Sequence, residues 1–143
     1  MTMNQAVMSI LGLPAAPEEA PMTQLDFVRM VREGISHAMV VQALANLGLS
    51  QESTSRAVGI APRSLARRKG GRLGAHETER FLRLVRVSAL AEEVLGGRDK
   101  ARRWLTCPNR ALGGESPMAL LDTDIGERLV EDTLGRLAHG VHS

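Results

Sequence analysis

The sequence predicts an all-α fold, for three reasons. Apolar residues make up 43% of the chain and aromatic residues only 2%, so leucine, valine, alanine and methionine must build the core, and these suit helices better than sheets. Apolar residues also recur at helical spacing between helix-capping residues and glycine stops. No segment of four or more residues alternates cleanly between apolar and polar side chains, so we expect no sheet.

The length of 143 residues suffices for two small helical lobes that share one core. Residues 1–21 are rich in Met, Ala and Pro, and this composition predicts a flexible N-terminal arm. We expect a first helical domain over residues 22–75 and a second over residues 76–143.

Four helices are predicted in the first domain. Ser and Thr residues that can cap a helix precede three of them, and a proline, which favours the first helical turn, opens the fourth. A glycine then ends each helix. The predicted starts are Thr23 (with Asp26 as its capping-box partner), Ser36, Ser50 and Pro62, and the predicted ends are Gly34, Gly48, Gly59 and Gly70.

One long helix and three shorter ones are predicted in the second domain. Each begins at a capping residue or a proline, and the longest and the last show apolar side chains at helical spacing. The predicted starts are Glu77, Asp99, Ser116-Pro117, and either Thr123 or Asp124. The apolar stripe of the long helix is Phe81, Leu84, Val85, Ala91, Val94 and Leu95, and the last helix places Ile125, Leu129, Val130, Thr133, Leu134 and Leu137 on one face.

Basic and acidic residues are separated along the chain, although the net charge is only +2. Residues 56–72 contain six arginines and lysines and no acidic residue, whereas residues 113–143 contain six acidic residues and two arginines. A chain with one basic block and one acidic end can bind two different partners.

Residues 50–69 have the pattern of a helix-turn-helix, with a turn at Gly59 and a second helix from Pro62. In this motif the second helix enters the major groove, where arginines reach guanine edges while other cations contact phosphates. The second helix offers Arg63, Ser64, Arg67 and Arg68 to bases, and Lys69 and Arg72 to phosphates. Thr54 and Ser55 depart from the usual apolar and alanine residues of the motif. A solvated face, or a surface that docks an acidic protein, remains an alternative.

The most specific pattern lies between residues 102 and 140. A short helix ends at the single tryptophan, a glycine turn follows, and a Ser-Pro start precedes an amphipathic helix that ends in His-Gly. The residues are Arg102, Arg103, Trp104, Leu105, Pro108, Asn109, Ala111, Leu112, Gly113, Gly114, Ser116, Pro117, Leu120, Leu121, Gly126, Val130, Leu134, Gly135, Arg136, Leu137, His139 and Gly140. In this pattern the chain resembles the C-terminal toxin-binding domain of the Xre/MbcA/ParS family of bacterial antitoxins, which usually carry a helix-turn-helix-like domain upstream. The resemblance covers the chain from about Ser36 to its end.

This resemblance implies an antitoxin that binds a cognate RES-type toxin, which degrades NAD, and occludes its active site with the last helix and the C-terminal residues. It further implies that the chain autoregulates its operon by binding operator DNA, and Ser50 and Gln51 resemble the phosphate contacts of Xre-type repressors. The implied toxin-binding residues are Leu129, Asp132, Thr133, Arg136, Leu137, His139, Gly140, Val141, His142 and Ser143. For His139, a helix-end cap that interacts with the helix dipole remains an alternative.

Four residues of the pattern have structural explanations. Trp104 is expected in the core, because tryptophan usually buries its ring system. Gly113 and Gly114 permit the positive φ of a tight turn, and Pro117 presets the first turn of a helix.

The sequence offers no constellation for catalysis and no cofactor or metal site, so we expect no enzyme. Cys107 lacks a neighbouring base, and His139 with His142 would supply only two metal ligands. One cysteine, no signal peptide and no apolar stretch of about 20 residues favour the cytoplasm. A palindromic operator implies a homodimer. The alternatives are a transcriptional regulator whose C-terminal domain only dimerises, without a toxin partner, and a helical adaptor that has lost DNA binding.

Overall fold

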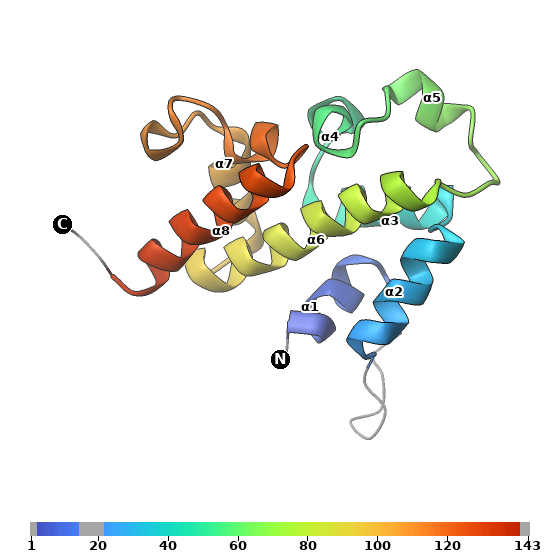
Figure 1. Cartoon of the computed structure of the whole chain (residues 1–143), viewed down its shortest axis with the longest axis horizontal. Helices are drawn as coiled ribbons and strands as arrows, with labels where there is room; N and C mark the ends of the chain where they lie inside the picture. Colours follow the sequence, from blue (N-terminus) through green and yellow to red (C-terminus); the bar gives the residue numbers. More distant parts are fainter. Residues whose placement is uncertain (1–2, 15–21, 141–143) are drawn as a thin grey trace.

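A computed structural model describes residues 3–14 and 22–140, and every regular element within these ranges is a helix, as predicted (Figure 1). The α-helices are α1 (Met3–Ile10), α2 (Gln24–Glu33), α3 (His37–Leu47), α4 (Gln51–Val58), α5 (Pro62–Ala66), α6 (Ala75–Leu95), α7 (Arg98–Thr106) and α8 (Asp124–Ala138). Two 3₁₀ helices, η1 (Arg110–Leu112) and η2 (Pro117–Leu120), lie between α7 and α8. None of the described helices is long and apolar enough to cross a membrane.

Helix α6 organises the fold, since α1, α2, α3, α4, α7 and α8 all contact it. In Figure 1 it runs through the middle of the molecule, with α1 and α2 on one side and α4, α7 and α8 on the other. Its side chains are buried on almost every face, as the core residues Phe81, Leu84, Val85 and Ala91 illustrate. Between Phe81 and Ala91 only Arg86 is exposed, so other elements surround this part of the helix. One core therefore serves the whole described chain.

Local capping explains most helix starts. The side chains of Thr23, Ser36, Ser50 and Thr123 each accept a hydrogen bond from a backbone N–H in the first turn of the helix that follows, which confirms four predicted caps. The prediction of Asp99 as a cap is wrong. Helix α7 begins at Arg98 with Gly97 as its N-cap, because the chain re-enters a helix immediately after the glycine stop of α6.

The prediction of a flexible arm over residues 1–21 is wrong for its described part. Residues 3–10 form α1, which packs on α6 and α3. Val7, Ile10 and Leu11 are buried in the common core, and the Ile10 carbonyl accepts a hydrogen bond from Asn46 Nδ2 at 2.9 Å. Residues 15–21 lie outside the described part of the chain.

Two further predictions differ from the structure at the ends of α5 and α6. Helix α5 ends at Ala66 instead of near Gly70, and residues 67–70 continue as turns. Helix α6 starts at Ala75, two residues before the predicted start, because Glu77 accepts a hydrogen bond from the Gly74 N–H and completes a capping box there.

The segment that leads into α6 pairs with the connection between α2 and α3. The Leu73 N–H donates to the Ile35 carbonyl and the His37 N–H to the Gly71 carbonyl, each at 2.9 Å. A Cβ atom on Gly34, whose φ is 79°, would lie only 2.1 Å from the Leu73 carbonyl oxygen. Glycine is therefore required at this crossing, where the chain before α3 meets the chain after α5.

Candidate functional site: a helix-turn-helix and an exposed helix face

Helices α4 and α5 form the helix-turn-helix. Ser50 caps α4, and Gly59 ends it with a φ of 75°, at a point where a Cβ atom would lie 2.5 Å from an Arg80 nitrogen. The turn thus needs glycine for its backbone angle, whereas the exposed Arg80 side chain can move away from an added Cβ atom. Pro62 is the first residue of α5, as predicted.

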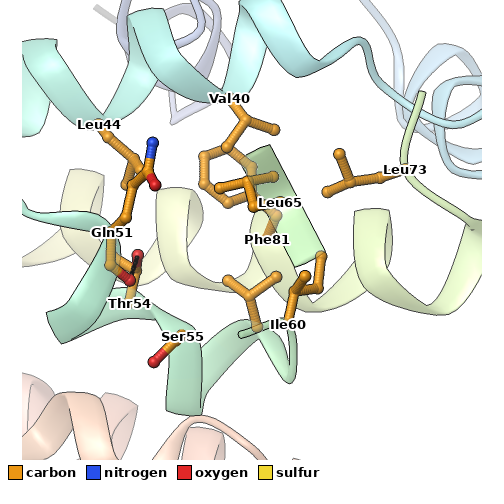
Figure 2. Close-up of a pocket in the computed structure, with 10 residues that line it drawn as sticks. Val40, Leu44, Gln51, Thr54, Ser55, Ile60, Leu65, Leu73 and Phe81 are labelled. Carbon is orange, nitrogen blue, oxygen red and sulfur yellow. Dashed lines mark hydrogen bonds between the residues drawn. The ribbon is translucent and has the colours of Figure 1, made fainter. Parts of the chain in front are cut away.

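A small apolar cluster holds α5 against the rest of the domain (Figure 2). Leu65 of α5 points inward, where it meets side chains from α3, α4 and α6 around a cavity of about 10 Å³, which has room for one water molecule at most. The residues that line it are Val40, Leu44, Gln51, Thr54, Ser55, Val58, Ile60, Leu65, Leu73 and Phe81. The cavity is part of the packing beneath α5 and cannot hold an organic ligand.

Thr54 and Ser55, which depart from the usual motif, satisfy their hydroxyl groups within α4. Thr54 is buried, and its Oγ1 donates to the carbonyls of Ser50 and Gln51, each at 3.0 Å. Ser55 Oγ donates to the Glu52 carbonyl at 2.9 Å. Because both hydroxyls are paired locally, these residues do not disturb the helix crossing.

The residues predicted to contact DNA fall into two groups. In the first group, Arg63, Arg67 and Lys69 are exposed, and Arg67 Nη2 donates to Ser64 Oγ at 3.2 Å across one helical turn. Ser50 and Gln51 lie at the start of α4, where Ser50 caps the helix and Gln51 is half-buried.

In the second group, Arg68 and Arg72 are engaged within the chain. Arg72 Nη1 donates to the Gly34 carbonyl at 2.7 Å, at the end of α2. Arg68 forms an ion pair with Glu77 at the start of α6. Its guanidinium hydrogen bond is the main cause that holds the pKa of the Glu77 carboxyl below its ordinary value, and the Gly74 N–H adds to the effect.

Helix α8 supplies a second exposed surface, which we name the α8 face: Ile125, Leu129, Asp132, Arg136 and Leu137. Of the six residues that the sequence places on one face of this helix, only Val130, Thr133 and Leu134 are buried. Ile125, Leu129 and Leu137 are 69%, 48% and 49% exposed. The apolar side chains of α8 therefore extend over more of the helix surface than the core covers.

Among the predicted toxin-binding residues that the structure describes, Thr133 differs from the others because it is buried. Its Oγ1 donates to the Leu129 carbonyl at 2.7 Å and accepts a hydrogen bond from Arg136 Nη2 at 3.2 Å. Thr133 therefore positions Arg136 on the α8 face. Ile125 was not among the predicted site residues, since helical periodicity alone places it beside the buried side chains.

The end of α8 is exposed. His139 is its C-cap residue, and its backbone N–H donates to the Gly135 carbonyl at 3.1 Å. Gly140 follows with a φ of 62°. Figure 1 shows this end of α8 and helix α5 at opposite ends of the molecule. The predicted site residues Val141, His142 and Ser143 lie outside the described part of the chain.

Arg83 of α6 fixes the start of α8. Its side chain is only 9% exposed, and it forms ion pairs with Asp124 and, at 3.3 Å, with Glu127. Arg83 Nη1 also donates to the Leu121 carbonyl at 3.0 Å, and exposed Arg86 pairs with Glu127 at 3.3 Å. A buried guanidinium that donates hydrogen bonds to Leu121 and Asp124 and forms a second ion pair with Glu127 thus sets the position of α8 on α6.

The four residues with structural explanations lie in α7 and in the segment between α7 and α8. Trp104 is half-buried and packs against the common core, so it is less deeply placed than expected. Gly113 and Gly114 have φ values of 71° and 85°, which favour glycine. Pro117 is buried at the first position of η2, after the capping residue Ser116.

Comparison with known proteins matches both parts of this architecture. Residues 26–86 match the antitoxin Xre-like helix-turn-helix domain, and residues 90–140 match the antitoxin Xre/MbcA/ParS C-terminal toxin-binding domain. The two matched segments meet inside α6, with no linker between them.

Curated relatives agree with these matches. The chain is 35% identical to "Antitoxin Xre" of Yersinia enterocolitica, over 99% of this chain and 94% of that protein. It is 40% identical to "Antitoxin Xre" of Photorhabdus laumondii over 62% of each chain, and 32% identical to "Mycobacterial cidal antitoxin MbcA" of Mycobacterium tuberculosis over 69% of this chain and 88% of that protein. The chain therefore belongs to the Xre/MbcA/ParS antitoxin family, whose members are helix-turn-helix regulators with a toxin-binding domain and not enzymes.

Proposed function

We propose that this antitoxin neutralises a cognate RES-type toxin, which degrades NAD, by placing the α8 face and the C-terminal residues over the toxin's active site. The exposure of Ile125, Leu129 and Leu137 carries this proposal. These three apolar side chains lie on the last helix of the toxin-binding domain and contribute little to the core. Contiguous apolar side chains that a fold leaves exposed are typical of a protein interface.

Inhibition on this model is steric and needs no chemistry from the antitoxin. The apolar side chains of the α8 face supply contact area, while Arg136, held by Thr133, and Asp132 supply polar contacts at its edge. His139 and Gly140 lie beyond the last buried residue, Leu134, and can therefore enter a pocket without disturbing the core.

The same chain is proposed to autoregulate its operon in the cytoplasm as a homodimer on palindromic operator DNA. Arg63 and Arg67 are one helical turn apart and exposed, so both guanidiniums are available to guanine edges. Ser64, whose hydroxyl accepts a hydrogen bond from Arg67, is proposed as a further base contact. Lys69, Ser50 and Gln51 are proposed as phosphate contacts, which position the protein without reading sequence.

Deleting residues 139–143 is expected to abolish protection against the toxin while the antitoxin stays folded. The described residues in this segment, His139 and Gly140, are exposed, so their removal takes no apolar surface from the core. NAD level and growth would be measured in cells that express the toxin from the neighbouring gene with either form of the antitoxin. The control variant is Leu25→Ser, which changes a 54% exposed aliphatic residue on α2, outside α8 and the C-terminal residues.

Full protection by the truncated form would show that another surface inhibits the toxin. Loss of protection with toxin binding retained through the α8 face, measured by pull-down, would support occlusion by the C-terminal residues. If the neighbouring protein neither binds the antitoxin nor lowers the NAD level, the chain is a regulator without this kind of toxin.

For DNA, replacing Arg63 or Arg67 with alanine should each weaken binding to the chain's own promoter by about 1–3 kcal/mol, because a bidentate base contact is lost. Lys69→Ala should instead weaken binding to all sequences alike and flatten its salt dependence. Titrations of promoter and random duplexes would separate the two effects, with Arg103→Ala, an exposed arginine of α7, as control. A triple variant that binds the promoter like the wild type would exclude this surface from DNA recognition.

A further inference from the structure

The cations of the helix-turn-helix differ in whether the chain itself already binds them. Within the described residues, the side chains of Arg63 and Lys69 form no ion pair, and they are exposed. Arg68 lies in the same basic block, one residue after Arg67, yet its guanidinium is bound to the Glu77 carboxylate. Arg68 therefore differs from Arg63 and Lys69, because the chain itself already supplies an anionic partner for its guanidinium.

The Arg68–Glu77 pair is built from both sides. Glu77 is held in place because its Oε1 accepts the Gly74 N–H at 2.9 Å in the capping box of α6, and the same oxygen accepts Arg68 Nη1. The two side chains are 35% and 22% exposed, so the pair is partly shielded from water. The pKa of Glu77 is lowered and that of Arg68 raised by their hydrogen bond, which keeps both groups charged.

A carboxylate and a phosphate offer a guanidinium the same kind of charged acceptor. An arginine that is bound to a carboxylate of its own chain must give up that partner before it can contact DNA. Glu77 therefore competes directly with the DNA backbone for Arg68, whereas no described acidic residue competes for Arg63 or Lys69.

We propose that Glu77 is a positioning residue that withholds Arg68 from DNA phosphates and thereby limits sequence-independent affinity. The inference rests on the proposed DNA binding by α5. With Arg68 withheld, the discrimination between operator and other DNA depends on Arg63 and Arg67, which no described acidic residue binds. Because sequence-independent affinity comes from phosphate contacts, removing one such contact raises the ratio of specific to non-specific binding.

Glu77→Gln is the direct test. Glutamine keeps an oxygen that can accept the Gly74 N–H and so preserves the start of α6, but it lacks the charge that holds Arg68. On a random-sequence duplex, the plot of log affinity against log salt should steepen by about 0.9 per bound chain, and affinity at 0.1 M salt should rise about eightfold. Glu79→Gln, at an exposed acidic residue two positions along α6, is the matched control and should change neither quantity by this amount.

The double variant Arg68→Ala/Glu77→Gln separates release of Arg68 from mere loss of a negative charge near DNA. If Arg68 is withheld in the wild type, removing both residues should return affinity and salt dependence to wild-type values. If the double variant keeps the gain of Glu77→Gln, repulsion by Glu77 is the cause and the proposal is wrong. If it binds with a shallower salt slope than the wild type, Arg68 contacts DNA in the wild type and the proposal is also wrong.

This experiment distinguishes failure of the inference from failure of the proposed DNA role. If the wild-type chain binds neither its promoter nor the random duplex, DNA binding by α5 is overturned, and the inference with it. If the wild type binds and the Arg63→Ala variant is weakened, but Glu77→Gln changes nothing, only the withholding of Arg68 is overturned. Circular dichroism of each variant checks that α6 is intact. If Glu77→Gln unfolds, Arg68→Ala serves as the test, because it keeps Glu77 and the start of α6. Affinity and salt slope on the random duplex equal to the wild type then support the withholding of Arg68, and a shallower salt slope overturns it.

Discussion

Arg83→Ala should lower the free energy of unfolding by about 3–5 kcal/mol, because it removes one partner of a buried ion pair. Glu127, whose side chain is 15% exposed, would lose its Arg83 partner, and the Leu121 carbonyl would lose its guanidinium donor. Total stabilities of domains this size are about 5–15 kcal/mol, so a loss this large removes a substantial fraction. Urea unfolding, followed by the fluorescence of the single tryptophan Trp104, would measure the change.

Arg86→Ala is the matched control for this measurement. Arg86 pairs with the same Glu127, also at 3.3 Å, but its side chain is 48% exposed. An exposed ion pair contributes about 0–1 kcal/mol, so the control should be nearly as stable as the wild type. Equal stabilities of the two variants would contradict a structural role for Arg83. The Arg83→Ala variant can also be tested for toxin binding at low temperature, where the chain is folded. A loss of binding there would show that toxin binding, in addition to stability, depends on the position of α8 on α6.

Ile10→Ala should cost about 2–5 kcal/mol, although it lies in a segment whose composition predicts a flexible arm. Ile10 is 0% exposed, and its side chain belongs to the core shared by α1, α3 and α6. Truncation there removes three buried carbon atoms with their contacts and leaves a cavity. The measurement is again urea unfolding, with unfolding detected through Trp104 as a reporter distant from α1 in the chain.

Leu25→Ala is the control for Ile10→Ala, since Leu25 is 54% exposed on α2 and should lose little stability when shortened. If both variants unfold at the same urea concentration, α1 does not belong to the cooperative core. A chain that lacks residues 1–13 should be less stable than either variant, because Val7 and Leu11 are lost with Ile10.

The features that the sequence predicts correctly depend on neighbours within one helical turn. Thr23 with Asp26, Ser36 and Ser50 are caps, because capping involves only residues that are three positions apart or fewer. The helix-turn-helix follows from the same local rules, with Gly59 and Pro62 at fixed offsets.

The features that the sequence fails to predict depend on contacts between distant segments. Helix α1 is short, so it needs α6 to stabilise it, and no local pattern reveals that partner. Periodicity fixes the direction of Ile125 on α8 but not how wide a surface η1, η2 and α6 cover. The pairing of Arg68 with Glu77 joins the turn after α5 to the first turn of α6, and its sequence separation of nine residues marks no motif.

Because the two matched segments meet inside α6, exchange of the toxin-binding half of this protein must preserve the register of that helix. A recombination event that adds or removes one residue in α6 rotates everything beyond the junction by about 100° and shifts it by about 1.5 Å. Arg83 would then no longer face Asp124. Hybrid antitoxins that combine the helix-turn-helix half of one relative with the toxin-binding half of another must therefore be joined without a change of register in α6.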